Sequence, residues 1–170
     1  MTEWDLTPKR VADSRVTLVQ LMGVTDANIA GNVHGGTVMK LVDTAAGLAA
    51  VKHCGGLAVT ASIDEMLFLH PVHIGDVVTV KAAVNDVGRT SMEVGVRVEA
   101  ENVVTGHRVR TGSAYLVFVA LDADERPRPV PPLMPETDVE LRRQREARVR
   151  RETRLAHKAA IEAVRNKDGG

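Results

Sequence analysis

The feature that most constrains the fold is a run from residue 35 to residue 54 that is apolar on nearly every side at helical spacing. Its apolar positions recur at i, i+3, i+4 and i+7, and Lys40 and Asp43 are its only charged residues before Lys52. A helix that is apolar all round is normally buried. We therefore predict a long buried helix, ended by Gly55-Gly56 and wrapped by a sheet.

Five runs within the first 121 residues alternate with a period of two, as strands do. One such run precedes the helix and four follow it: 14–21, 57–68, 76–87, 89–101 and 108–121. Thr105-Gly106 predicts a hairpin turn, and the segment 86–88 predicts a second one. One helix followed by a meander of long strands predicts an α+β fold in which the helix lies on an antiparallel sheet.

The C-terminal part has a different composition. Five of the seven prolines lie between residues 126 and 135, so we predict that 124–135 is an extended linker that leaves a domain spanning 12–123. Residues 136–168 predict a charged helical tail, whose thin apolar stripe consists of Leu141, Val149, Leu155 and Ala159. We favour a solvated helix packed lightly on the body or on a neighbouring subunit. A basic contact with nucleic acid or a membrane is the alternative.

Several classes of protein are disfavoured by composition. The 22 basic and 22 acidic residues balance, and Cys54 has no second cysteine with which to form a disulfide. No stretch has the length of apolar sequence that a membrane span needs, so we expect a cytoplasmic protein without membrane insertion. Only four aromatic residues are present, Trp4, Phe68, Tyr115 and Phe118, which argues against base stacking and hence against nucleic-acid binding.

The densest cluster of polar and glycine residues is 31–37, at the start of the predicted helix. Paired glycines allow another molecule to approach the backbone, and the free N–H groups of a helix start attract either a bound anion or a transient oxyanion. Asp43 lies about two turns further along. Among apolar neighbours its carboxylate is costly to bury unless it is paired or functional. On this reasoning two roles for Asp43 remain equally open. It could be a general base whose pKa is raised by partial burial, or a structural aspartate at a subunit contact.

The sequence GNVHGGTVMKLVDTAAGLAAVKHC, residues 31–54, closely resembles the hotdog-fold acyl-CoA thioesterases of the brain acyl-CoA hydrolase and YciA type. The resemblance continues through ASIDEMLFLHPVHIGDVV, residues 61–78, and VGRTSME, residues 87–93. It covers about residues 12–123. It implies a hotdog fold, and pairs of protomers with an active site in each cleft between them. A homodimer, and a trimer of such dimers, is therefore expected.

The resemblance further implies hydrolysis of an acyl-CoA thioester without a metal or an organic cofactor. Asp43 would activate water or attack the carbonyl carbon, and Asn32 of the partner protomer would orient the water or the carbonyl. The backbone N–H of Gly36, or of Gly35, would polarise the thioester oxygen. Thr44 could hydrogen-bond near this site, although an ordinary place on the helix surface is favoured.

The resemblance also implies where the rest of the substrate would bind. The CoA contacts are expected in the segment Gly88, Arg89, Thr90 and Ser91, where the guanidinium could pair with a phosphate. An exposed turn is the alternative. The acyl chain needs an apolar slot beside the helix, which we expect among Val59, Ile63, Met66 and Leu67.

The histidines and the cysteine are considered as acid–base groups or metal ligands. His34 could be an acid, a base or a ligand, but a structural hydrogen bond is favoured. His70 and His73 flank Pro71 in a predicted loop, where their spacing does not suit a metal. Cys54 is expected to be buried, and no metal site is predicted.

Two rival functions remain. A hotdog hydratase or dehydratase would use a histidine and a carboxylate, here His34 and Asp43. A non-catalytic acyl-CoA sensor would use the basic tail to contact DNA or a protein. The presence of both Asn32 and Asp43 favours the thioesterase over either rival.

Overall fold

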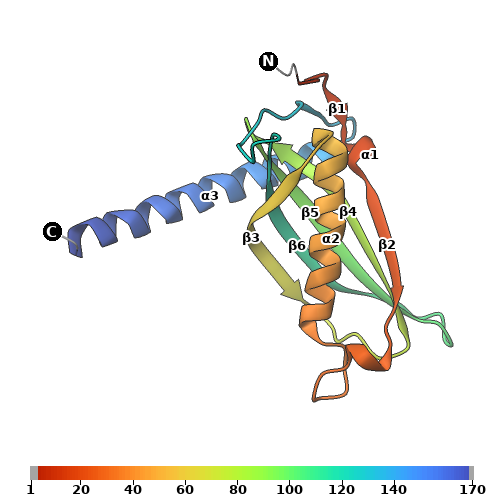
Figure 1. Cartoon of the computed structure of the whole chain (residues 1–170). Coiled ribbons are helices and arrows are strands. Elements are labelled where there is room, and N and C mark those ends of the chain that lie inside the picture. The colour runs from red at the N-terminus through yellow and green to blue at the C-terminus, as the bar shows by residue number, and fades with distance from the viewer. Residues whose placement is uncertain (1–3, 169–170) are drawn as a thin grey trace.

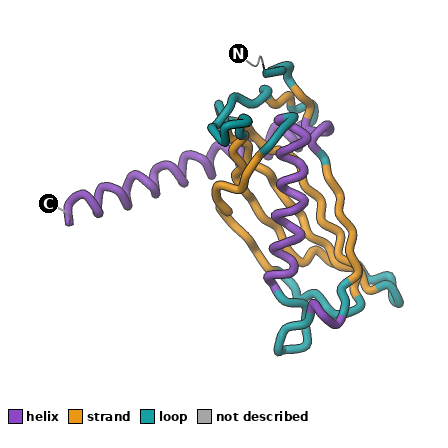
Figure 2. The backbone as a smooth tube through the Cα atoms, in the orientation of Figure 1, coloured by secondary structure: helices purple, strands orange, loops and turns teal. Residues whose placement is uncertain are grey.

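The computed structural model describes residues 4–168, which form a five-stranded antiparallel sheet with one long helix packed on its inner face (Figures 1 and 2). The strand order is β2-β4-β5-β6-β3, so β2 and β3 are the edge strands. The sheet strands are β2 (Val16–Leu21), β3 (Ala58–Phe68), β4 (Asp76–Val87), β5 (Ser91–Asn102) and β6 (Arg108–Ala120). The other elements are β1 (Lys9–Arg10), α1 (Val11–Ser14), a 3-10 turn (Val24–Asp26), α2 (Gly35–Cys54), β7 (Leu133–Met134) and α3 (Asp138–Asp168). The expected hotdog arrangement, a helix wrapped by a sheet with a C-terminal helix, is confirmed.

Small side chains bring α2 close to the sheet. Four of its fully buried residues are alanines, at positions 45, 46, 49 and 50. Gly47 also faces the sheet, because a Cβ there would lie 3.5 Å from the Phe118 ring. The inner faces of the central strands supply larger, fully buried partners: Val78, Val80, Val84, Val94, Val98 and Leu116. Branched side chains from the sheet therefore interdigitate with a helix that is almost smooth on that side.

The prediction that α2 is buried on every side is wrong for the single chain. The sheet covers one face, while Met39 is 40% exposed, Leu48 45% and Val51 38% on the other. A five-stranded sheet curves around only part of a helix. The apolar residues on the far side therefore form a contact surface with no partner within residues 4–168.

The predicted strands agree with the observed ones to within about two residues at most ends. The differences have local causes. Val11–Ser14 forms one helical turn before β2, and the buried hydroxyl of Ser14 donates to the carbonyl of Val11 and accepts from the N–H of Val84. The turn expected at 86–88 lies further on, because Asp86 and Val87 still pair with Glu93 and Met92.

The proline-rich segment does not leave the domain as predicted. It folds back over the C-terminal end of α2, where Arg128 is 3% exposed and donates to the carbonyls of Cys54 and Leu121 at 2.9 and 3.1 Å. Strand β7 then pairs in parallel with β1. Proline prevents regular ladders, but it does not prevent packing when one arginine satisfies several buried carbonyls.

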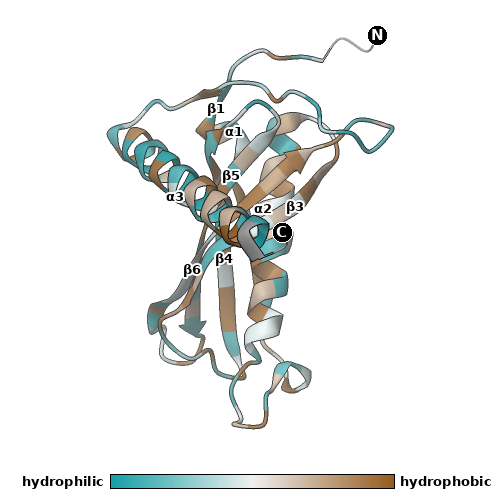
Figure 3. Ribbon diagram, turned by 90° about the vertical axis from the view of Figure 1, so that its left-hand side faces the viewer, coloured by the Kyte–Doolittle hydropathy of each residue, from teal (hydrophilic) through white to brown (hydrophobic). Residues whose placement is uncertain are grey.

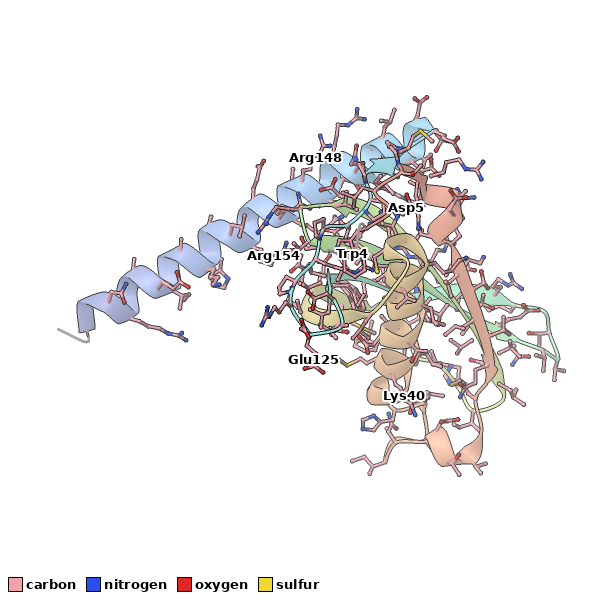
Figure 4. The ribbon with its side chains drawn as sticks, turned by 45° about the horizontal axis from the view of Figure 1, so that its top comes forward. Trp4, Asp5, Lys40, Glu125, Arg148 and Arg154 are labelled. Carbon is pink, nitrogen blue, oxygen red and sulfur yellow. The ribbon has the colours of Figure 1, made fainter. Side chains whose placement is uncertain are left out.

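Helix α3 crosses the outer face of the sheet and then extends away from it (Figures 1 and 3). The predicted apolar stripe does not form its contact, since Leu141, Val149 and Leu155 are exposed, although Ala147 is buried. Most of the contacts are ion pairs. The pairs follow the strand order: Glu140 with Arg15, Arg148 and Arg151 with Asp86, Arg150 with Glu93, and Arg154 with Asp64. Figure 4 labels Arg148 and Arg154 on the half of α3 that lies against the body. Four of the basic residues of the tail are therefore engaged by the domain itself.

The carboxylates under α3 make its first half part of the domain. The side chains of Asp86 and Glu93 are only 3% and 4% exposed, and the guanidinium of Arg150 also stacks 3.6 Å from the centre of the Tyr115 ring. Removing one partner of a buried ion pair leaves a desolvated charge and costs a few kcal/mol.

We expect a chain that ends at Pro135 to lose at least about 3 kcal/mol of unfolding free energy, because Asp86 and Glu93 lose their partners. A chain that ends at His157 keeps these contacts and is the matched control. It should unfold at the same denaturant concentration as the full chain. Urea titration followed by circular dichroism measures both. Equal stability of all three chains would contradict this account of α3.

Candidate active site

A stiff loop leads into α2 and carries two asparagines. The side-chain oxygen of Asn28 accepts from the N–H groups of Ala30 and Asn32, at 2.9 and 3.2 Å. Gly31 has a φ of 81°, a conformation that glycine adopts readily. Asn32 then forms a β-bridge with His73, and its side-chain oxygen lies 3.0 Å from Nδ1 of that histidine. Both asparagine side chains are therefore held by hydrogen bonds.

His34 is the N-cap of α2. Its Nδ1 accepts the N–H of Gly36 at 2.8 Å, and a Cβ at position 36 would lie only 2.9 Å from that nitrogen. The N–H of Gly36 is thus already engaged, unlike the free donor expected from the sequence. In the described part of the chain the N–H of Gly35 has no acceptor. Of the two predicted oxyanion donors, only Gly35 remains available.

A pocket of about 320 Å³ lies beside this helix start. It contains Asn32 and Gly35, two of the predicted site residues, together with Asn28, which the sequence reasoning missed. The remaining lining residues are Val33, Val38, Phe68, Leu69, His70, Pro71, Val72 and Thr111. The pocket therefore has a polar end formed by the loop and the helix start, and largely apolar walls.

Asp43 does not lie in this pocket. It is exposed on α2, eight residues after Gly35 and hence about 12 Å further along the helix axis. Its Oδ1 accepts a 2.7 Å hydrogen bond from the hydroxyl of Thr60 on β3. The partial burial expected for this carboxylate is absent from the single chain, and one chain does not bring Asp43 to Asn32.

Thr44 faces its own helix. Its hydroxyl donates to the carbonyl of Lys40 at 2.8 Å, which is the usual bond of a threonine within a helix. This arrangement corresponds to the ordinary surface position that the sequence favoured for Thr44.

The predicted CoA turn lies at the other end of the sheet. Its backbone is fixed, because the N–H of Gly88 donates to the carbonyl of Ser91 and the carbonyl of Thr90 accepts from Ala120. Arg89 is exposed. The 12 residues of β4 separate this turn from the loop around His73, which corresponds to about 40 Å. One chain therefore cannot bring residues 88–91 to Asn32.

The predicted acyl slot is an open surface in the single chain. Val59, Ile63 and Leu67 are 41%, 43% and 42% exposed on the edge strand β3, while Met66 packs against the core. Ile63 and Met66 pair with the inward-facing Leu116 and Ala114 and so lie on the same side of the sheet as Asp43. Val59 and Leu67 pair with Val119 and Ser113 and face the opposite side, so the predicted slot residues do not share one face.

His53 and Cys54 have structural contacts. The Nε2 of His53 lies 2.9 Å from the carbonyl of Pro131, and burial lowers the pKa of this imidazole. The Cys54 thiol is buried and donates to the carbonyl of Gly56 at 3.2 Å. Within residues 4–168 there is no cluster of metal-binding side chains, and no helix is long and apolar enough to span a membrane.

Two residues of the site region, Asn28 and Thr60, were missed by the sequence reasoning, and His73 was considered there only as a metal ligand. Thr60 lies in a predicted strand, where an alternating polar residue is expected and does not indicate a functional site. Asn28 sits in a polar loop where no spacing rule distinguishes it from Asn32. Only the position of Asp43 opposite β3, and the bridge between Asn32 and His73, reveal these contacts.

Comparison with known proteins places the chain in a family. Residues 30–107 match the model of the thioesterase superfamily. The mouse cytosolic acyl coenzyme A thioester hydrolase is 39% identical over 145 residues, which cover 84% of this chain and 38% of the mouse protein. The chain thus spans less than half the length of that relative. It belongs to the thioesterase superfamily.

Solved structures agree with this assignment. A hexameric acyl-CoA thioesterase is 38% identical, with a TM-score of 0.87 over 90% of this chain and 98% of its own. An acyl-CoA hydrolase from Staphylococcus aureus, solved with butyryl coenzyme A and coenzyme A, is 33% identical, with a TM-score of 0.86 over 95% and 99%. Variants of that hydrolase with an aspartate, an asparagine or a threonine replaced by alanine have similar structures.

The N-cap predicts a specific effect on stability. His34→Ala removes the acceptor for the N–H of Gly36 and should cost about 1 kcal/mol of unfolding free energy. His34→Asn is the matched control, because asparagine caps helices well and should retain most of that stability. Chemical denaturation measures both. If His34→Asn lost as much stability as His34→Ala, the capping role would be contradicted.

Proposed function

We propose that this protein is an acyl-CoA thioester hydrolase whose active sites lie between two copies of the chain. One observation carries the proposal: the residues for the reaction are all present, but one chain holds them apart. Asn32 and Gly35 line the pocket, whereas Asp43 is exposed on an apolar helix face. The acyl-CoA hydrolases among the similar structures support the substrate class.

A two-fold axis beside β3 would complete the site. The β3 edge is unpaired within the described chain, and two-fold pairing of this strand with its copy is necessarily antiparallel. Such pairing would cover the apolar faces of both α2 helices. It would also place the loop end of one protomer beside the opposite end of the other, where residues 88–91 lie. Arg89 of a partner protomer would then be near the phosphates of a bound CoA.

The chemistry follows from the available groups. The N–H of Gly35, reinforced by the helix dipole, would polarise the thioester oxygen. Asp43, positioned by the Thr60 hydroxyl, would activate a water molecule or attack the carbonyl carbon, and an asparagine of the partner loop would orient the reactants. The thiolate of CoA then leaves and takes up a proton. Attack by water gives the free acid directly, whereas attack by Asp43 gives a mixed anhydride that water hydrolyses to the acid and the free carboxylate. We infer no requirement for a metal or an organic cofactor.

The rival functions are less well supported. A hydratase would need His34 as an acid or base, but its Nδ1 caps α2. A DNA-contacting sensor would need a free basic tail, but Arg148, Arg150, Arg151 and Arg154 pair with carboxylates of the body. We therefore infer no nucleic-acid partner and no membrane insertion. The cytosolic relatives support a cytoplasmic location, and the hexameric structure supports a trimer of dimers.

Asp43→Asn, which keeps the size and the Thr60 contact, should lower thioester hydrolysis by at least about a hundredfold, because an amide is neither base nor nucleophile. CoA binding should persist. Thiol release from a series of acyl-CoAs, acetyl to palmitoyl, measures turnover, and calorimetry measures binding. Unchanged turnover would contradict the role of Asp43. Absence of release by the unsubstituted protein, with CoA still bound, would favour the sensor.

Sharing of the site predicts complementation. Asp43→Ala and Asn32→Ala chains, each inactive, should recover about a quarter of normal activity when unfolded together and refolded as a mixture, since half of the two-fold dimers then hold one intact site. The experiment is repeated with Asn28→Ala in place of Asn32→Ala. Whichever asparagine variant is inactive alone and restores activity with Asp43→Ala identifies the asparagine that serves the reaction. No recovery with either partner would contradict a site formed between two protomers.

A further inference from the structure

The outer face of the sheet, opposite α2, contains a hollow. It has a volume of about 620 Å³ and lies between the sheet and the first turns of α3. This is within the range of about 300–1,000 Å³ typical of small-molecule sites. Its walls come from β2, β4, β5, β6 and α3, and its charged lining residues are Arg15, Lys81, Arg97, Glu99, Arg110, Arg142, Arg143 and Glu146.

The lining is strongly cationic. Six basic side chains face two carboxylates. Lys81 and Arg97 share the single carboxylate of Glu99, at 2.9 and 2.7 Å. Arg110 lies across the ladder from Glu99, and within residues 4–168 neither Arg110 nor Arg143 has a carboxylate partner. The hollow therefore has an excess of positive charge that the protein does not neutralise.

The floor of the hollow contains two small residues, and the Asn85 side chain lies against one of them. Gly95 and Ala83 oppose each other on its floor, and a Cβ on Gly95 would lie 2.4 Å from the Nδ2 of Asn85. Glu99 is 7% exposed, and the hydrogen bond from Lys81 lowers the pKa of its carboxyl against the opposing effect of burial. An ionised, buried carboxylate fixes the two cations beside it, so that less side-chain entropy is lost when an anion binds.

We propose that this basic hollow binds a small polyanion that carries two or more phosphate groups, such as the diphosphate of a nucleotide. Guanidinium groups from opposite walls, Arg110 on β6 and Arg143 on α3, match such a ligand because arginine binds phosphate oxygens in a bidentate manner. The bound anion would link the sheet to α3. This site lies on the face opposite Asp43 and does not depend on the proposed thioesterase activity.

The test is calorimetric titration of the full chain with inorganic pyrophosphate. The double variant Arg110→Gln/Arg143→Gln should weaken binding at least about tenfold, because two charge-assisted contacts are lost. Arg145→Gln is the matched control. It removes an exposed arginine of α3 outside the hollow and should change binding less than about twofold. Glu146→Gln, which removes one lining carboxylate, should strengthen binding.

Circular dichroism must show that the variants fold like the parent chain. No binding by the parent chain at about 1 mM pyrophosphate, or equal weakening by Arg145→Gln and by the double variant, would overturn the proposal.

A second titration, with ADP in the presence and absence of saturating CoA, identifies the source of the phosphates. ADP binding that persists with CoA and depends on Arg110 and Arg143 indicates a free nucleotide. ADP binding that CoA abolishes, with the same dependence on both arginines, indicates that the hollow receives the diphosphate of CoA. ADP binding that is independent of these arginines would count against the site.

Discussion

The packing of α2 on the sheet is the contact on which the rest of the structure depends. Alanines on one side of the helix let it approach strands whose valines and leucines fill the gap. The same helix carries apolar residues on its other side, which five strands cannot reach. A chain that builds its core in this way also creates a surface for association. Asp43 lies on that exposed side, so the fold itself places the candidate base at the boundary between two molecules.

The outer face of the sheet follows a different physical rule. It is polar, and its buried carboxylates are neutralised by the arginines of α3 rather than covered by apolar side chains. This explains why a helix with little apolar periodicity still docks. A planar guanidinium can pair with a carboxylate and stack on an aromatic ring at the same time, as that of Arg150 does on Glu93 and Tyr115. Beyond Arg154, α3 has no such partner on the sheet among residues 4–168, and it extends away from the sheet.

The sequence allowed the strands and the central helix to be predicted because periods of two and of 3.6 record which face is buried. Contacts without a period could not be predicted. Arg128 binds the carbonyl of Cys54 at the end of α2 from a segment 74 residues away, and nothing in its proline-rich surroundings indicates that it is buried. Within the site, the glycine pair predicted a helix start. The hydrogen bond from the N–H of Gly36 to His34 depends on the rotamer of one side chain, and no sequence pattern predicts that rotamer.

A site divided between two chains makes activity depend on association as well as on chemistry. The asparagines are held by hydrogen bonds within one chain, Gly35 is fixed at the start of α2, and Asp43 is held by Thr60, so each half is preorganised before the halves meet. Binding energy at the apolar interface would then provide the alignment that catalysis requires. Dilution should therefore reduce the number of complete sites without altering the intrinsic rate of those that remain. The apolar face of α2 thus serves stability and chemistry together, and a polar substitution there would impair both.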